Sequence, residues 1–252
     1  MTKELEFRVI EEAVGGVALD SAVLIYRGAN STAFATVHPI HHDDAGAASI
    51  LPGRPMTMLA VARLAKRLGS ARRPGGFVPM NLLYQDLTTM AWWVPPARRH
   101  IWFRCTGGEL GAPERGESVP HPGLVFAATS DRTWRVWAVK GCDRPSEATP
   151  LFQAPYFNVY GTGAICQGNV DVPTGGFAES VADRIEAWNK AFFDSFFTHP
   201  NTQGPLVNYK GGPYRFWRDM LDGRHAVFPE SALVPLGTSL AQVLDRRGPD
   251  GG

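Results

Sequence analysis

The chain has 252 residues, of which 44% are hydrophobic, and its 25 Lys and Arg side chains nearly balance 24 Asp and Glu. This composition is globular and excludes a long coiled coil, and a net charge of +1 argues against nucleic acid or an anionic membrane as a direct partner. Residues 1–16 carry acidic side chains where a signal peptide needs an apolar run, and no stretch approaches 18 uncharged apolar residues. We therefore expect a soluble cytoplasmic protein.

The first 50 residues have the pattern of short strands. Three β-like runs cover residues 5–13, 21–28 and 31–40, and the turn residues 28–30 join the last two. We interpret residues 1–50 as an N-terminal β-meander extension. The following Gly- and Pro-rich stretch is typical of a loop or a domain boundary.

A helix is predicted over residues 57–69. Val61, Leu64 and Leu68 recur at helical spacing and would form its apolar side. Three cations gather on the opposite side: Arg63, Lys66 and Arg67. Such a basic face is usually solvated, but it can also dock an acidic partner.

From residue 82 the pattern changes to strands. The expected strands are residues 82–87, 89–96, 97–105, 123–129 and 133–140. We predict one hairpin around Pro95-Pro96 and another around Ser130-Asp131. The result would be a run of antiparallel strands.

An extended, proline-punctuated segment follows at residues 144–177, where four prolines argue against a regular central strand. A helix is predicted to begin at Ser180, because Asp183 three residues later completes the pattern of a capping box. Its apolar stripe would comprise Val181, Ile185, Trp188, Phe192 and Phe196. A short helix is expected over 214–221, and residues 241–252 are expected to be a frayed tail.

One candidate for chemistry is a metal site formed by His38, His41 and His42 with Asp43 and Asp44, because imidazole and carboxylate together can hold a divalent ion. The spacing is not helical, and adjacent histidines point apart in a strand. A polar turn after a strand is therefore the favoured interpretation, and we predict neither a metal nor another cofactor.

The three cysteines are Cys105, Cys142 and Cys166, and none belongs to a C-x-x-C pair, so reduced thiols are expected. Cys105 ends an apolar strand and should be buried, whereas Cys142 should lie exposed in a turn. Cys166 lies in a glycine-containing irregular loop, eight residues after Asn158. Nucleophilic catalysis at cysteine needs a thiolate and a donor that steadies the oxyanion, which an Asn amide can supply. The alternative is an ordinary loop cysteine.

Four residues of this loop, Asn158, Gly163, Ile165 and Cys166, resemble the active-site stretch of ubiquitin-conjugating enzymes. There a His-Pro-Asn tripeptide precedes the thioester cysteine, and here Tyr156-Phe157-Asn158 occupies its place. The order of predicted elements is also similar. The resemblance implies an α+β fold with a ubiquitin-conjugating-enzyme-like core: a helix, a four-stranded antiparallel meander, the cysteine loop and a crossover helix. Residues 51–240 would form this core.

Over most of its length the chain resembles the PRTRC system protein B family, a plasmid-associated bacterial family classed with the prokaryotic ubiquitin-conjugating-like (family D) group. The stretches that carry the resemblance are residues 92–99, 119–122, 153–160, 192–195 and 198–201. The resemblance implies that Cys166 receives the C-terminus of a ubiquitin-like protein from an adenylating enzyme as a thioester, and passes it to an amine. Asn158 would donate to the oxyanion, and Arg63, Lys66 and Arg67 would dock the activating enzyme.

The chain also departs from the conjugating-enzyme pattern. The His and Pro of the tripeptide are absent, so Tyr156 and Phe157 would have to order the loop. Gly168 stands where many conjugating enzymes carry an acidic residue, and Asp171 is the nearest carboxylate. His199-Pro200-Asn201 comes after the crossover helix, where the resemblance places a structural turn. An inactive conjugating-enzyme-like scaffold that binds other PRTRC proteins is therefore the alternative function.

Overall fold

The computed structural model describes residues 8–9, 19–27, 33–43, 46–57, 59–61, 63–64, 77–86, 88–129, 132–167, 170, 172–173 and 180–245. The chain divides into two compact units, residues 1–74 and 75–252. This division falls later in the chain than the boundary that the sequence suggests near residue 50. Each unit is described by itself below.

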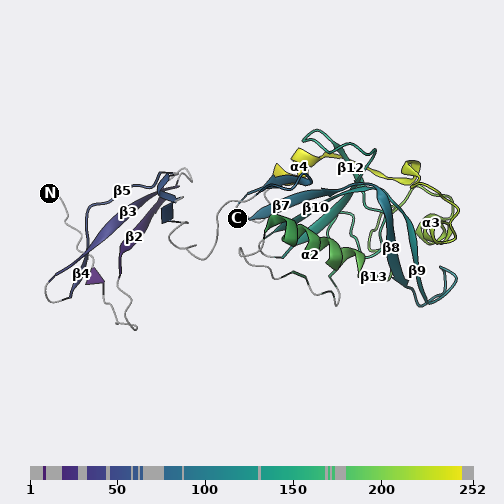
Figure 1. The fold of residues 1–252 in the computed structure, drawn as a ribbon, viewed down its shortest axis with the longest axis horizontal. Coiled ribbons are helices and arrows are strands. Elements are labelled where there is room, and N and C mark those ends of the chain that lie inside the picture. The colour runs from purple at the N-terminus through teal and green to yellow at the C-terminus, as the bar shows by residue number, and fades with distance from the viewer. Residues whose placement is uncertain are drawn as a thin grey trace. The chain divides into compact units, whose positions relative to one another are not determined.

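The first unit is built around a β-sheet (Figure 1). Its strands are β1 (Arg8–Val9), β2 (Ser21–Arg27), β3 (Ala33–His42), β4 (Ala48–Ile50) and β5 (Arg54–Pro55). β2 and β3 pair antiparallel from Ser21↔Pro39 to Arg27↔Ala33, which confirms the predicted hairpin. Residues 59–61 and 63–64 are helical, as predicted, and Arg63 is exposed.

The second unit contains a six-stranded antiparallel sheet, in the order β14-β12-β11-β10-β7-β6, and a three-stranded sheet, in the order β13-β8-β9. Its first strands are β6 (Leu82–Gln85), β7 (Thr89–Val94), β8 (Ala97–Arg104), β9 (Glu114–His121), β10 (Gly123–Thr129) and β11 (Trp134–Val139). Those that follow are β12 (Pro150–Gln153), β13 (Phe196–Phe197) and β14 (Pro235–Ser239). The mixed α+β fold with antiparallel sheets agrees with the predicted fold class.

The hairpin predicted around Pro95-Pro96 is wrong. β7 pairs with β10 from Thr89↔Thr129 to Val94↔Leu124, and β8 pairs with β9 from Ala97↔His121 to Arg104↔Glu114. The register is the same on both sides of the break, so the four strands form one long hairpin that turns between β8 and β9. Pro95-Pro96 and Pro122 bend it instead, because proline has no N–H to donate to the ladder. The bend sends β8 and β9 away from the six-stranded sheet toward α3 (Gly212–Leu221) (Figure 1).

Several strands were not predicted, namely β9, β12, β13 and β14 of the second unit, and β4 and β5 of the first unit, which lie in the stretch interpreted as a loop or a domain boundary. The argument that prolines exclude a strand fails at β12, which begins with Pro150 and pairs with β11 and β14. A proline at the first position of a strand costs no ladder bond. The hairpin predicted around Ser130-Asp131 is confirmed by the pairing of β10 with β11.

The predicted crossover helix is α2 (Val181–Phe193). The capping box is present, because the Ser180 hydroxyl accepts from the Asp183 N–H and the Asp183 side chain accepts from the Ser180 N–H. The buried residues of α2 are Ile185, Trp188 and Phe192. Phe196 does not continue this stripe, since the helix ends at Phe193 and Phe196 belongs to β13, which pairs in parallel with β8.

The remaining helices follow α2. The predicted short helix is α3, and a 3-10 turn covers Glu230–Ala232. Residues 241–245, expected to be part of a frayed tail, belong to α4 (Leu240–Asp245), in which Leu240 is buried. The apolar contacts of Leu240, Val243 and Leu244 with the sheet explain this order.

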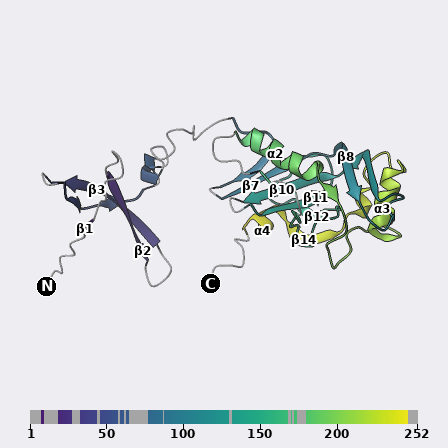
Figure 2. The same cartoon turned by 90° about the horizontal axis from the view of Figure 1, so that it is seen from below.

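Side chains alternate between two cores on the faces of the six-stranded sheet. Phe126 and Val136 point into the larger core, together with side chains from α2 and α3, while Val125 and Trp137 point into a smaller core with Leu240 of α4. Figure 2 shows α2 on one side of this sheet and α4 on the other. Within the described residues, no helix is long and apolar enough to cross a membrane.

Candidate functional site

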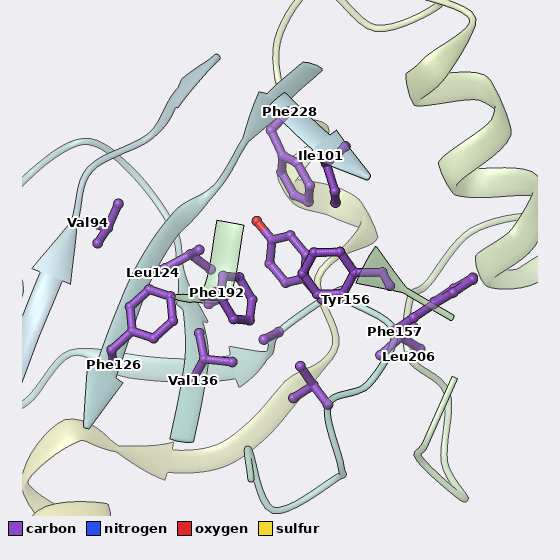
Figure 3. Packing of buried hydrophobic residues seen from close by; sticks show 14 of the residues in the cluster. Val94, Ile101, Leu124, Phe126, Val136, Tyr156, Phe157, Phe192, Leu206 and Phe228 are labelled. Atoms are coloured by element: carbon purple, nitrogen blue, oxygen red, sulfur yellow. The ribbon is translucent and has the colours of Figure 1, made fainter. Parts of the chain in front are cut away.

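The cysteine loop starts from buried aromatic residues. After β12 the chain runs through Tyr156 and Phe157, both fully buried. The Tyr156 hydroxyl lies 2.6 Å from Nδ1 of His121, and its ring packs against Phe192 with centroids 5.1 Å apart. Phe157 contacts Phe103, at 5.3 Å between ring centroids. These rings lie deep in the larger core (Figure 3), so the two residues that replace His-Pro fix the path of the loop by packing.

Beyond Phe157 the loop folds into a narrow hairpin. The Cys166 N–H donates to the Asn158 carbonyl at 2.7 Å, and the Tyr160 N–H donates to the Ala164 carbonyl at 2.8 Å. Between these bonds, Val159 and Ile165 form an antiparallel bridge. The returning arm also pairs with β11, since the Ile165 N–H donates to the Trp134 carbonyl at 3.2 Å. The backbone that leads into Cys166 is therefore held in place.

The turn of this hairpin requires glycine at position 163. Gly163 has a φ of +84°, and a Cβ there would lie 2.5 Å from Nε1 of Trp137. Its carbonyl accepts from the Val136 N–H at 2.8 Å. The lack of a side chain thus allows the loop to lie directly on β11.

The Cys166 thiol is partly exposed at the end of this hairpin. Tyr160, 43% exposed, lies on the opposite arm of the hairpin, and interaction with the Cys166 side chain is the main factor that raises the pKa of Tyr160. Cys105, by contrast, is buried as predicted, and its Sγ lies 3.2 Å from the Thr198 carbonyl. Burial, with the charge of Glu109, raises the pKa of Cys105 to about 11, which keeps that thiol protonated at neutral pH.

Asn158 lies beside Cys166 through the backbone, but its amide binds another segment. Its Oδ1 accepts from the Thr198 N–H at 3.1 Å and from the Thr198 hydroxyl at 2.8 Å, and its Nδ2 donates to the Phe196 carbonyl at 2.9 Å. The Asn158 N–H donates to the His199 carbonyl at 2.9 Å. In the structure, then, Asn158 ties the cysteine loop to the segment that follows α2.

Asn158 also has a φ of 61°, in the left-handed region, and this allows a test of its two roles. We expect Asn158→Gly to lower the free energy of unfolding by about 2–3 kcal/mol, because three side-chain hydrogen bonds are lost while the backbone conformation stays favourable. Asn158→Ala should cost about 1 kcal/mol more, because alanine is strained at positive φ. Urea unfolding of both variants measures the difference, and equal losses would contradict a strained backbone at this position.

The remaining predicted site residues lie away from Cys166 or outside the residues that the structure describes. Lys66, Arg67, Gly168 and Asp171 are outside the described residues. His199-Pro200-Asn201 lies in the turn after β13, and His199 contributes its carbonyl to Asn158. No sequence pattern predicted that Phe196 and Thr198 contact the cysteine loop, since they lie 38 and 40 residues after Asn158.

The histidine cluster has no metal-site geometry. Both ring nitrogens of His38 are engaged, one 2.6 Å from the Thr36 hydroxyl and the other 2.8 Å from the Leu51 carbonyl. Nε2 of His42 lies 2.9 Å from the Leu19 carbonyl. Across the described part of the chain, no three His, Cys, Asp or Glu side chains are grouped so that they could hold a metal ion. Local hydrogen bonds account for His38 and His42, and Asp44 lies outside the described residues.

Comparison with known proteins adds the family. No curated protein and no solved structure matches the chain. The family model described as prokaryotic E2 family D, where E2 denotes a ubiquitin-conjugating enzyme, matches residues 58–236. This range holds the cysteine hairpin, α2 and the segment bound by Asn158. The chain belongs to prokaryotic E2 family D.

Proposed function

We propose that this protein is a conjugating enzyme that carries the C-terminus of a ubiquitin-like protein as a thioester on Cys166. The observation that carries the proposal is the partly exposed Cys166 thiol at the end of a hairpin that backbone hydrogen bonds hold on β11. The other cysteines fit less well, because Cys105 is buried and Cys142 lies in an exposed turn without such a frame. Membership in an E2 family supports the same reaction class.

The reaction would be a thioester exchange. The Cys166 thiol loses its proton to solvent, and the thiolate attacks the carbonyl carbon of a thioester that an adenylating enzyme presents. A new carbon–sulfur bond forms, the donor's carbon–sulfur bond breaks, and the donor thiolate leaves and takes a proton from solvent. In a second step an amine attacks the new thioester, the amide forms and Cys166 is released as a thiol.

The partners belong to the proposal as well. We place the adenylating enzyme on Arg63, which is exposed, together with Lys66 and Arg67, which the sequence predicts on the same helix face. The other partners that we propose are the ubiquitin-like protein and the other proteins of a plasmid-borne PRTRC system. A cytoplasmic setting suits a reactive thiol, and all three cysteines are free in the structure.

One observation favours the alternative function, a catalytically inactive scaffold that binds these partners. The Asn158 amide, expected to donate to the oxyanion, is bound to Phe196 and Thr198. The Asn158 amide has two N–H hydrogens, and one of them is donated to the Phe196 carbonyl. The oxyanion role of Asn158 therefore depends on the second hydrogen, or on release of the amide when the substrate binds.

A reaction with the full chain, ATP, and the adenylating enzyme and ubiquitin-like protein of the same genome tests the two functions. We expect an adduct that a reducing agent cleaves, since thiols attack thioesters. Cys166→Ser should give either no adduct or one that resists the reducing agent, because an oxygen ester replaces the thioester. Cys142→Ser, at an exposed cysteine, is the matched control and should react like the unmodified chain. A cleavable adduct that forms equally well on Cys166→Ala would refute the proposal, and no adduct on the unmodified chain would favour the scaffold.

A further inference from the structure

We propose that two copies of this protein associate by pairing their β2 strands antiparallel, edge to edge, so that the sheets of two first units become one continuous sheet. The partner is a second copy of this chain, and the surface that binds it is the outer edge of β2 (Ser21–Arg27). The inference goes beyond the proposed function and does not depend on it.

β2 lies at an open edge of the sheet in the first unit. β3 pairs with β2 on one side and with β4 and β5 on the other. Figure 1 shows β3 between β2 and β5. Among the described residues, no strand pairs with the outer edge of β2. An open edge of this kind presents backbone groups that can bind another strand.

The direction of the backbone groups along β2 follows from two hydrogen bonds. The Ile40 N–H donates to the Asp20 carbonyl at 3.2 Å, and hydrogen-bonded pairs alternate with the other kind along an antiparallel ladder. Ala35, which is opposite Ile25, agrees with this alternation, because its carbonyl accepts from the Met56 N–H on the far side of β3. The N–H and C=O groups that point to the open edge therefore belong to alternate residues of β2: Ser21, Val23, Ile25 and Arg27.

The sequence of β2 is complementary to itself in an antiparallel pair. When two copies pair with Leu24 at the centre, Val23 is opposite Ile25 of the second copy, and Ser21 is opposite Arg27. Each of these opposing residues has its backbone groups directed outward, so both can exchange hydrogen bonds. The contact is the same on both copies and closes on a two-fold axis, which limits the assembly to a dimer.

The apolar side chains of β2 also favour this contact. Val23 is 41% exposed and Ile25 is 70% exposed, and they share one face of the sheet with Val37 and Ala35 of β3. Among the side chains that the structure describes in the first unit, Ala48 alone is buried. The pairing places Val23 against Ile25 of the second copy on the same face, so it shields apolar surface that the single sheet exposes.

The charges at the ends of β2 are compatible with the same pairing. Arg27 is the only charged residue within the strand, and it is opposite Ser21 of the second copy. Asp20 directly precedes the strand, so it lies diagonal to Arg27 of the second copy. Opposite charges therefore approach each other at both ends of the pair, and like charges do not.

β2 lacks the features that usually block edge-to-edge pairing. It has seven residues, contains no proline, glycine or lysine, and pairs with β3 in one unbroken register. The other edge strands that the structure describes carry such features. β1, β5 and β13 have two residues each, the pairing of β6 with β7 has a register shift, β14 contains Pro235 and Gly237, and β9 contains Pro120.

Sedimentation velocity of the full chain tests the association. We expect a species of about twice the chain mass of 27.5 kDa that dominates at about 100 µM and dissociates on dilution. Ile25→Lys should weaken the association about tenfold or more, because it places a charge in both symmetric contacts between Val23 and Ile25. Val227→Lys is the matched control, since Val227 is 76% exposed in the second unit, and it should leave the association unchanged.

Disulfide cross-linking tests the register. Leu24 would be opposite Leu24 of the second copy in a non-hydrogen-bonded pair, with Cα atoms about 4.5 Å apart, which a disulfide can bridge. In the full chain carrying Cys142→Ser and Cys166→Ser, in which the remaining Cys105 is buried, Leu24→Cys should give a linked dimer under mild oxidation. Ile25→Cys should give about ten times less, because the two copies of residue 25 are diagonal, with Cα atoms more than about 7 Å apart.

Either measurement can overturn the inference. A chain that stays monomeric at about 100 µM, or a dimer that Ile25→Lys leaves unchanged, would refute pairing through β2. Equal cross-linking by Leu24→Cys and Ile25→Cys would refute the register centred on Leu24. Circular dichroism shows whether each variant is folded, and Leu24→Cys adds no charge to the edge, so the cross-linking result stands even if Ile25→Lys does not fold.

Discussion

Acidification from pH 6.5 toward pH 3 should remove up to about 5 kcal/mol from the free energy of unfolding, through one side chain, His121. His121 is 1% exposed, and burial, followed by the charge of Arg99, lowers its pKa from 6.5 to about 3, although a hydrogen bond with the Arg99 carbonyl acts in the opposite direction. The Tyr156 hydroxyl lies 2.6 Å from Nδ1 of this imidazole, and the Arg99 carbonyl lies 3.2 Å from Nε2. A neutral ring with its proton on Nε2 satisfies both contacts, because Nδ1 then accepts from Tyr156.

The sign follows from the two pKa values. Below pH 6.5 the unfolded chain binds a proton at His121, whereas the folded chain stays neutral there until about pH 3. Stability is therefore complete above pH 6.5 and is lost progressively down to pH 3. Since domains are stable by about 5–15 kcal/mol, this one group can decide whether the second unit survives mild acid.

Urea unfolding of the full chain at pH 7, 6, 5 and 4 measures this loss. His121→Gln is the comparison variant, because an amide can keep polar contacts but does not titrate. This variant should be less stable than the parent at pH 7, yet lose less stability between pH 7 and pH 4. Because the carboxylates titrate in both proteins, the difference between their losses of stability is the contribution of His121. If the free energy of unfolding depends on pH equally in the parent and the variant, the pKa of His121 is not lowered by folding.

Phe157→Ala should cost about 3–5 kcal/mol of stability, because it empties a fully buried ring site directly before Asn158. The ring packs against Phe103 and Tyr214, with centroids 5.3 and 5.0 Å apart. Its loss removes packing from the core side of the cysteine loop. Phe157→Leu, which keeps most of the volume, should cost clearly less.

The matched control for Phe157→Ala is Phe34→Ala, in β3 of the first unit. Phe34 is 60% exposed, so its removal creates no buried cavity and should cost only about 1 kcal/mol, the scale of its stacking on Tyr26. Thermal or urea unfolding of the three variants measures the order of effects. A loss for Phe157→Ala as small as that for Phe34→Ala would mean that the loop is not anchored by its aromatic residues.

Local sequence patterns predicted the elements that depend on interactions between residues close together in the chain. The capping box of Ser180 and Asp183 started α2 where expected, and the turn residues between β10 and β11 marked a real hairpin. The candidate thiol was also distinguished from a buried one, because an apolar strand end buries Cys105 while a glycine-containing loop presents Cys166.

The parts that sequence reasoning missed depend on contacts between distant residues. Pro95-Pro96 has the composition of a turn, but strand pairing over the whole length of β7 to β10 makes it a bend. β12 and β14 are short and contain proline. They pair with each other although they are far apart in the sequence, so no local pattern predicts the pairing. The partners of the Asn158 amide follow α2, and no spacing rule connects them.

The tie between Asn158 and Thr198 has a consequence for how this stretch can vary among relatives. It pins the chain on both sides of the passage from Gln167 to Ser180: the cysteine hairpin is fixed on β11 before it, and α2 with β13 is fixed after it. Lengthening a connection between two fixed ends costs only about 0.6 kcal/mol for each doubling of its length. Insertions in that passage should therefore leave the sulfur where it is, so the cysteine hairpin and the crossover helix can be inherited together while the stretch joining them diverges.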